Sequence, residues 1–450
     1  MFFIFTQKNG KQRTFKRGSH PEHHKGRTEY LPIERMPFVE EYTLPLSQHI
    51  GAPSLPIVQK GQQVQRGEVI AKPGGFVSVS LHSPVTGMVT AVELSEHPNG
   101  QMLPAIKIKT DPYSTQCFGK AEPLSDQKRD KAHFISSVQS SGIVGMGGAA
   151  FPAHVKFFIP EGKHCQFLVI NGCECEPFLT ADHRVMVEQA PQLIEGIGIL
   201  AEFLGAQKTY IGIEANKPDA IVILNELAVQ KNISIEVVPL QVKYPQGAEK
   251  MLITAVLKQE VPSGKLPLDV ETVVSNVGTV IALTNYFTKS EPLVERVVTV
   301  TGSGIKRPAN LLVPIGTPIQ EIINVCGGLN EGATRVLLGG PMMGVAQKNL
   351  GGPVLKGTSG ILVLTDEEVQ EMQLYKCIRC GRCLQACPIF LNPSHLGLLA
   401  RKGLYDDMAQ INLMDCMECA CCSFVCPSGI PLVQSFRVAK AILREKEVKQ

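Results

Sequence analysis

The chain lacks a long apolar run. No uninterrupted apolar stretch in its 450 residues reaches the about 20 residues that cross a bilayer. The longest candidate, Leu193 to Ala206, carries Glu195 and Glu202. The apolar start, Met1 to Phe5, gives way at once to polar and basic residues, which argues against a signal peptide. The sequence therefore predicts no direct membrane span, so any membrane association would come through partner subunits.

An excess of charge of one sign is also lacking. The 44 Lys and Arg residues nearly balance the 41 Asp and Glu residues, and the net charge is +3. This balance is too close to neutral to indicate binding of nucleic acid or of an anionic membrane surface. The chain length predicts two to four domains.

A disulfide framework is missing as well. The chain has 14 cysteines, and eight of them fall into two runs near the C-terminus. The other six show no pairing pattern: Cys117, Cys165, Cys173, Cys175, Cys326 and Cys421. Reduced thiols of this kind are typical of cytoplasmic proteins.

The two cysteine runs share one spacing, C-x2-C-x2-C-x3-C-P, which is the ligand run of two-cluster ferredoxins. In that pattern the fourth cysteine of each run ligates the cluster of the other run. The sequence therefore predicts two [4Fe-4S] clusters. The first is held by Cys377, Cys380, Cys383 and Cys426, and the second by Cys416, Cys419, Cys422 and Cys387.

Structural zinc is the alternative for these cysteines. Zinc sites usually pair two cysteines and add two more ligands after a gap, which fits the doubled run poorly. Cys421 falls out of register and is interpreted as a packed bystander. The insert from His395 to Met408 has apolar residues at helical spacing, so the runs are predicted to belong to an α-helical dicluster module.

The N-terminal part of the chain contains two segments of different composition. Residues 11–35 are basic, and His20, His23 and His24 there favour a surface arm over a metal site. From Met36 the chain has short β-type runs separated by Gly and Pro. These runs resemble the barrel-sandwich fold of lipoyl and biotinyl carrier domains, but the lysine that would be modified is missing before Pro84. An unmodified docking or packing domain is expected.

The middle of the chain, from about residue 131 to 286, has an α/β pattern. A glycine-rich loop runs from Gly142 to Pro152, and bare glycine backbone lets N–H groups approach a phosphate or flavin closely. Three strands are expected at Phe167–Asn171, Thr209–Ile213 and Thr272–Asn276, each ending in polar residues. Open α/β sheets bind ligands at the carboxyl ends of their strands, so a site is predicted at that edge.

Several segments together carry a family resemblance. The middle segment resembles the flavin-bearing, NADH-oxidising subunit of respiratory complex I. The whole chain resembles the C subunit of the Rnf-type ferredoxin:NAD+ oxidoreductases, which are also called electron transport complexes. Besides both cysteine runs, the residues that carry it are Phe15–Pro21, Gly147–Pro152, Asn171–Pro177, Lys243–Lys250, Asn276–Thr279 and Leu338–Gly344.

The resemblance implies where the cofactors bind. It puts FMN against Gly145, Gly147 and Gly148, with Lys156, Asn171, Glu214 and Asn276 around it. It puts Glu174 and Glu176 on the nicotinamide side of a bound NAD(H) and stacks Phe151 on the adenine. Two residues depart from the complex I pattern: Cys173 stands where an acid is usual, and Ala150 where a glycine is usual.

The resemblance also implies the organisation and the partners. The partners would be other subunits of a membrane electron transport complex, including a ferredoxin-like iron–sulfur subunit, and the chain would lie peripherally on the cytoplasmic face. The expected parts are an arm (1–35), a barrel-sandwich β domain (36–126), an α/β FMN/NADH domain (127–290), a β-grasp-like SLBB domain (291–365) and an α-helical dicluster ferredoxin domain (366–450).

Flavin chemistry explains this combination of parts. FMN exchanges two electrons with a nicotinamide and one at a time with a cluster, so no side chain need act as an acid or base. Two alternatives stay open. One is a cobalamin reductase of the propanediol-utilisation type, although there the barrel-sandwich region is expected after the flavin domain. The other is a flavin-free iron–sulfur relay scaffold, which flavin and iron analysis with an NADH–acceptor assay would distinguish.

Overall fold

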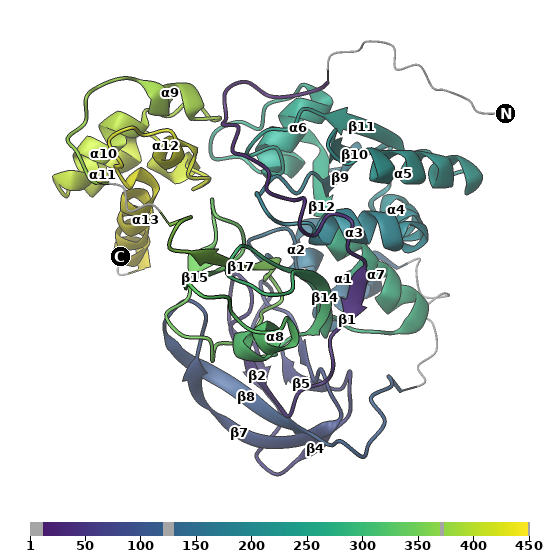
Figure 1. The fold of residues 1–450 in the computed structure, drawn as a ribbon. Coiled ribbons are helices and arrows are strands. Elements are labelled where there is room, and N and C mark those ends of the chain that lie inside the picture. Colours follow the sequence, from purple (N-terminus) through teal and green to yellow (C-terminus); the bar gives the residue numbers. More distant parts are fainter. Residues whose placement is uncertain (1–11, 120–129, 370–372, 449–450) are drawn as a thin grey trace.

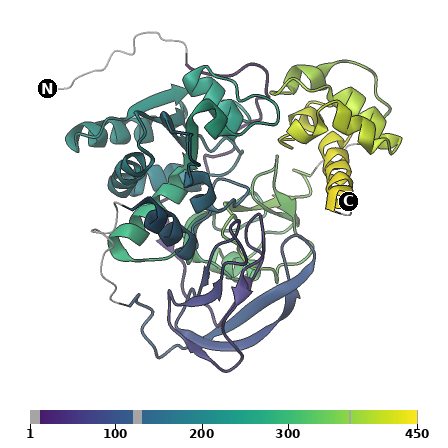
Figure 2. The same cartoon turned by 180° about the vertical axis from the view of Figure 1, so that it is seen from behind.

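The computed structural model describes residues 12–119, 130–369 and 373–448 (Figure 1). The apolar start, Met1 to Phe5, and the expected domain boundary at 126/127 lie outside these ranges. A β-rich lobe, an α/β domain and a mixed sheet pack together, and a helical C-terminal lobe stands to one side (Figures 1 and 2).

The β-rich lobe consists of two antiparallel sheets that share one apolar core. The four-stranded sheet has the order β2-β8-β7-β4, with β2 (Glu41–Pro45), β4 (Gln63–Val64), β7 (Gly87–Glu96) and β8 (Met102–Thr110). The smaller sheet contains β3 (Leu55–Pro56), β5 (Val69–Lys72) and β6 (Leu81–His82). The turn before Pro84 is buried, and Ser83 has no exposed surface. A carrier domain needs an exposed residue there, so the burial agrees with a packing domain.

The α/β domain is built on a four-stranded parallel sheet in the order β11-β10-β9-β12. Its strands are β9 (Phe167–Gly172), β10 (Lys208–Glu214), β11 (Glu236–Leu240) and β12 (Thr272–Asn276). The three predicted strands are confirmed to within a residue or two at their ends. Asn171 pairs in register with Asn276 on one side and with Gly212 on the other, so the polar strand ends meet at one edge.

Helices cover this sheet on both faces (Figure 1). They are α1 (Lys131–Ser140), α2 (Ala153–Phe157), α3 (Ala181–Glu188), α4 (Ala190–Leu204), α5 (Pro218–Gln230), α6 (Glu249–Leu257) and α7 (Val277–Lys289). Helix α4 buries Leu193, Ile197 and Leu200 while Glu195 and Glu202 are exposed, which is the pattern of an amphipathic surface helix. Within the described ranges, no helix combines the length and the apolar character that crossing a bilayer requires.

The third sheet has six strands in the order β1-β14-β13-β17-β15-β16. They are β1 (Ile33–Arg35), β13 (Glu295–Thr301), β14 (Ala309–Pro314), β15 (Ala333–Leu338), β16 (Val345–Ala346) and β17 (Gly360–Thr365), and α8 (Ile319–Val325) packs on them. Strand β1 belongs to the expected N-terminal arm, yet it pairs in parallel with β14.

The expectation of a surface arm over residues 1–35 is therefore wrong for the part that the structure describes. His20, His23 and His24 are exposed as expected, but Phe15 and Lys25 are buried against other segments. The basic composition of this stretch concealed its packing, because the partners of the buried side chains lie far away in the sequence.

The C-terminal lobe is α-helical, as predicted. It contains α9 (Arg382–Ala386), α10 (Pro393–Arg401), α11 (Tyr405–Gln410), α12 (Cys421–Phe424) and α13 (Leu432–Val448). The insert from His395 to Met408 is helical, as predicted, and it lies in two short helices, α10 and α11. Gly403, with φ of +69°, lies between them in a backbone conformation that ends α10 and that most other residues avoid.

Candidate functional site

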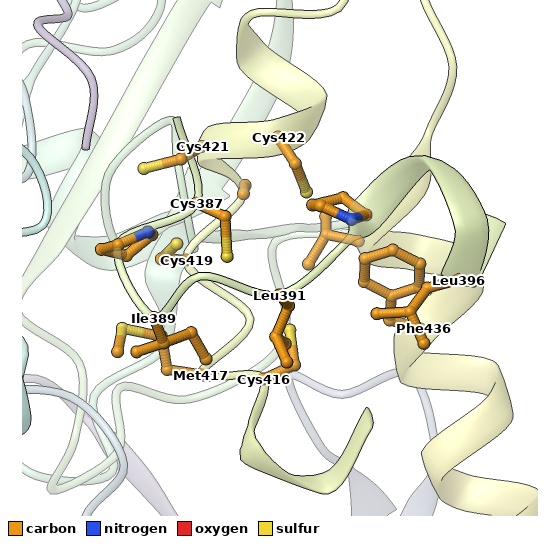
Figure 3. A pocket seen from close by; sticks show the side chains of 14 residues that line it. Cys387, Ile389, Leu391, Leu396, Cys416, Met417, Cys419, Cys421, Cys422 and Phe436 are labelled. Atoms are coloured by element: carbon orange, nitrogen blue, oxygen red, sulfur yellow. The ribbon is translucent and has the colours of Figure 1, made fainter. Parts of the chain in front are cut away.

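Cysteines of both runs surround a pocket in the C-terminal lobe. The four predicted ligands of the second cluster, Cys387, Cys416, Cys419 and Cys422, all line it, and Cys421 lines it as well (Figure 3). The rest of the wall is mainly apolar, including Ile389, Leu391, Leu396, Val433 and Phe436. The structure thus brings together the four thiols predicted for the second cluster, although they come from two runs that are separate in the sequence.

The chemistry of this pocket fits a bound metal cluster. Burial raises the pKa of the Cys416 thiol to about 11 although the nearby charge of Lys440 lowers it, so the free thiol is protonated at neutral pH. A coordinated metal deprotonates its thiol ligands and compensates for the buried charge. Among the described residues, no three His, Cys, Asp or Glu side chains gather as ligands of a single metal ion. In a cubane each thiolate binds a different iron, so the sulfurs surround the cluster rather than one point.

The other four cysteines lie in a more exposed part of the lobe. Cys377 and Cys380 are exposed, while Cys383 and Cys426 are partly buried. Burial, together with the neighbouring Cys426 and Cys380 thiols, raises the pKa of Cys383. Hydrogen bonds from Tyr375 N to the Ser428 carbonyl (3.0 Å) and from Ser428 Oγ to the Lys376 carbonyl (3.1 Å) place the start of the first run beside the end of the second.

The glycine-rich loop is held firmly at its base and left open at its tip. Gly145 N donates to the Phe151 carbonyl (2.8 Å), and Met146 N donates to Thr279 Oγ1 at the start of α7 (2.9 Å). A Cβ at Gly147 would lie 3.1–3.3 Å from the Asn276 side chain. A Cβ at Gly148, by contrast, would meet no atom within 4 Å. Bare backbone therefore faces open space next to Asn276, as a flavin cradle requires.

Two buried cations brace this loop, and sequence reasoning missed both. Lys356 Nζ donates to the Gly142 carbonyl (2.6 Å) and to the Ser80 carbonyl of the β-rich lobe (3.0 Å). Arg296 donates to the Lys356 carbonyl (2.6 Å) and to the Met146 carbonyl (3.4 Å). Burial lowers the pKa of Lys356 to about 7. Residues of neighbouring domains therefore hold the glycine-rich loop, in addition to the bonds that it makes within the α/β domain.

The amide side chains at the strand ends are bonded to neighbouring segments of the α/β domain. Asn276 caps α7, accepting from Gly278 N (2.9 Å), and its Nδ2 donates to Asp182 Oδ2 (2.7 Å). Asn171 Nδ2 donates to the Gly247 carbonyl (2.8 Å). Lys156 on α2 forms an ion pair with Glu249 at the start of α6. These side chains lie around one sheet edge, close to the glycine-rich loop.

The predicted carboxylates already have protein partners. Glu174 accepts from Asp182 N (2.8 Å) and His183 N (3.1 Å) at the start of α3. Glu176 accepts from Met343 N (2.9 Å) and Met342 N (3.1 Å), and burial raises its pKa to about 7. Glu214 forms a fully buried ion pair with Lys217 (3.0 Å). The roles of these acids in binding FMN or nucleotide stay predictions, as does stacking by the half-buried Phe151.

Two further charged residues at this edge also escaped sequence reasoning. Lys25 is buried, and its Nζ donates to the carbonyls of Glu174 (2.9 Å), Glu176 (3.0 Å) and Leu179. Asp182 is half-buried beside Glu174, and desolvation followed by that neighbouring charge raises its pKa. Neither residue has a local signal: Lys25 belongs to a basic stretch, and Asp182 resembles any acid in a first helical turn.

Four known families match successive parts of the chain. The family described as "Nuo51 FMN-binding domain" matches residues 138–285, and "4Fe-4S dicluster domain" matches residues 373–430. "RnfC Barrel sandwich hybrid domain" matches residues 13–113, and "SLBB domain" matches residues 297–346. The fold class predicted from the sequence is confirmed. The chain is an oxidoreductase subunit that unites a flavin domain with an iron–sulfur domain.

Relatives along nearly the whole length define the family. The chain is 43% identical over 404 residues to the C subunit of the "Proton-translocating ferredoxin:NAD(+) oxidoreductase complex" of Clostridium ljungdahlii, covering 90% of this chain and 88% of the relative. It is 42% identical over 437 residues to the C subunit of the "Na(+)-translocating ferredoxin:NAD(+) oxidoreductase complex" of Acetobacterium woodii, covering 96% and 97%. The chain belongs to the family of C subunits of Rnf-type ion-translocating oxidoreductase complexes.

A solved structure shares part of this fold. The crystal structure of NAD+-reducing [NiFe]-hydrogenase in the H2-reduced state matches with a TM-score of 0.50 at 18% identity, covering 71% of this chain and 63% of that chain. At this identity the likeness concerns the fold alone.

Proposed function

We propose that this chain is the NAD(H)-interacting subunit of a membrane-bound Rnf-type complex, and that it passes electrons between NAD(H), FMN and two [4Fe-4S] clusters. The relatives named above are subunits of ferredoxin:NAD+ oxidoreductase complexes that translocate protons or Na+. By that kinship, its partners are the other subunits of such a complex, including a ferredoxin-like iron–sulfur subunit, at the cytoplasmic face of the membrane.

The observation that carries the proposal is the loop from Gly142 to Pro152. Its base is bonded to α7 and to two buried cations, while the tip at Gly148 opens onto free space beside Asn276. Exposed backbone N–H groups at such a tip can bind a phosphate or approach a ring closely. Asn171, Lys156 and Asn276 surround the same sheet edge and would orient the bound group.

FMN, when bound, supplies the conversion between two-electron and one-electron transfer. The protein's own residues bind and orient the cofactor and nucleotide and keep the clusters near. The four cysteines around the buried pocket would ligate one cluster, and Cys377, Cys380, Cys383 and Cys426 the other. No described side chain needs to act as a general acid or base in this scheme.

The test is a pair of matched glycine variants. Gly148 and Gly162 are both exposed, both have positive φ, and a Cβ at either would meet no atom within 4 Å. Gly148→Val should abolish flavin binding and NADH-dependent dye reduction because its side chain occupies the cradle. Gly162→Val should retain both, and both variants should keep about eight iron, as expected for two cubanes. Full flavin and full dye reduction in Gly148→Val would overturn the assignment.

A further inference from the structure

A short N-terminal segment lies between the α/β domain and the C-terminal lobe (Figure 1). This segment, Phe15 to Ser19, is called the clip below. On one side it is bonded to the α/β domain. Ser19 N donates to the Tyr244 carbonyl (2.8 Å), Tyr244 N donates to the Ser19 carbonyl (2.9 Å), and Lys243 Nζ donates to the Phe15 carbonyl (2.8 Å).

On its other side the clip is bonded to the first cysteine run. Gly18 N donates to the Ala386 carbonyl (3.2 Å), next to Cys387. Arg17 donates to the Leu384 carbonyl (2.8 Å), and its guanidinium lies 4.1 Å from the centre of the Phe390 ring. The clip therefore holds the chain on both sides of Cys387 while it is itself fixed to Tyr244.

The odd thiol, Cys421, lies at the same junction. Its Sγ lies 3.3 Å from Ser19 Oγ and donates to the Tyr244 carbonyl (3.7 Å). Cys421 is fully buried and packs with Tyr244, Ala386 and Cys419 in one apolar cluster. Its packing, predicted from the sequence, is thus packing between domains, on the side of the lobe that carries the buried cysteine pocket.

Tyr244 connects this junction with the nucleotide edge of the flavin domain. The side chain is buried, and its hydroxyl lies 3.5 Å from Glu176 Oε1. Glu176 in turn accepts from Met342 N, and Met342 packs against the same apolar cluster as Cys421. Tyr244 therefore contacts both Glu176, which is predicted to lie on the nicotinamide side of the site, and the apolar cluster at the surface of the C-terminal lobe.

We propose that Arg17, Gly18 and Ser19 of the clip, together with Tyr244, are positioning residues that fix the pocket of Cys387, Cys416, Cys419 and Cys422 against the flavin domain, and so set the rate of electron transfer between them. This inference rests on the proposed function. Each transfer takes one electron from reduced flavin and adds one electron to the cluster, and the clip neither gains nor loses a proton. The clip acts by geometry, because transfer depends steeply on the placement of donor and acceptor.

The test uses clip variants with a control from the same segment. Gly18 has φ of +89°, and a Cβ there would lie 2.6 Å from the Tyr244 carbonyl oxygen, so Gly18→Val forces the clip off Tyr244. Arg17→Ala removes the contacts with Leu384 and Phe390. Lys16→Ala is the control, because Lys16 is exposed beside them. The full chain, loaded with flavin and iron, is mixed with NADH in a stopped-flow instrument, and flavin and cluster absorbance are followed separately.

We expect Gly18→Val to slow cluster reduction about ten- to a hundredfold, the scale of a misplacement of about 1 Å, with NADH reducing the flavin at the normal rate. Arg17→Ala should show a smaller fall, and Arg17→Lys should restore much of the rate because it keeps a cation over Phe390. Lys16→Ala should behave like the unchanged protein. A role in folding alone would lower iron content, whereas the proposal predicts full flavin and iron in Arg17→Ala.

Hydrogen exchange provides a readout that does not depend on activity. Amides of the clip, of Tyr244 and of residues 384–390 should exchange faster in both clip variants than in Lys16→Ala. If Gly18→Val loses its iron, the proposal is tested by comparing Arg17→Ala with Lys16→Ala. Equal cluster-reduction rates and equal exchange in these two would overturn the inference. If NADH fails to reduce any flavin in the unchanged protein, the proposed function is wrong. The exchange data would still show whether the clip fixes the lobe to the flavin domain.

Discussion

The flavin domain and the C-terminal lobe are built in opposite ways. At the edge of the flavin sheet, Glu174, Glu176 and Glu214 are already bonded to amides or to a lysine of the protein. In the lobe, the thiols of Cys387 and Cys422 face a pocket, and Cys422 belongs to the apolar core of the lobe itself. The acids at the flavin edge are therefore held by bonds within the protein, whereas the lobe has its predicted metal ligands as part of its core.

The largest expected effect is on the lobe. Cys387→Ala should remove the cluster predicted for the buried pocket, leaving about four of eight iron. Because metal binding and folding are coupled in small metal domains, hydrogen-exchange protection should fall in α10 to α13 and remain in the flavin sheet. Iron analysis, electron paramagnetic resonance and exchange measure this. Cys426→Ala is the matched variant, and it should spare the pocket. Loss of the same cluster in both variants would contradict the cross-ligation.

The next effect tests the bonding network of the flavin domain. Glu214→Ala leaves Lys217 as an unpaired charge in a fully buried position, and breaking such a pair costs about 3–5 kcal/mol. The control is Glu236→Ala in the same domain, whose ion pair with Arg13 is exposed and worth less than about 1 kcal/mol. Urea unfolding followed by a flavin-domain probe compares the two. Equal destabilisation would mean that the buried pair does not hold the domain together.

The third prediction concerns the pH dependence of stability that Lys356, which bonds to the glycine-rich loop, should cause. Its pKa is lowered by burial from 10.5 to about 7, so between pH 7 and about 10 the unfolded chain binds more protons than the folded one. The free energy of unfolding should therefore rise with pH in that window, by a few kcal/mol at most. Lys356→Met should remove this rise when unfolding is measured at several pH values. A rise that persists unchanged in the variant would show that other groups cause it.

The smallest effect is expected at Glu176. Glu176→Ala should weaken NADH binding by about 1–3 kcal/mol, roughly ten- to a hundredfold, while flavin stays bound. Burial raises the folded pKa from 4.5 to about 7, so the folded protein binds more protons between these values. The contribution of Glu176 to stability is thus present at low pH and is lost as pH rises through 7. Titration of NADH binding and unfolding at pH 5 and pH 8 checks both, with Glu174→Ala for comparison.

Local patterns predicted the cysteine pocket and the sheet edge. Cysteine ligands of ferredoxin-type clusters recur at fixed short spacings, so the two runs indicated which thiols would meet before any fold was known. The strands at Phe167–Asn171 and Thr272–Asn276 are buried apolar runs, and parallel pairing then brings their polar ends together. In each case, the information lay within a few neighbouring residues.

Only the tertiary structure decided which residues contact the polar strand ends and the cysteine runs. Lys25 bonds to the Glu174 carbonyl across 149 residues, and Ser19 meets Cys421 across 402. Likewise, the bonding of Glu176 to Met342 and Met343 comes from a loop of another domain. Such contacts leave no periodicity or spacing in the sequence, because each partner satisfies a buried polar group that appears only once distant segments have packed. The sequence by itself determined the chemistry that the chain carries, and packing between domains decided how its parts are held together.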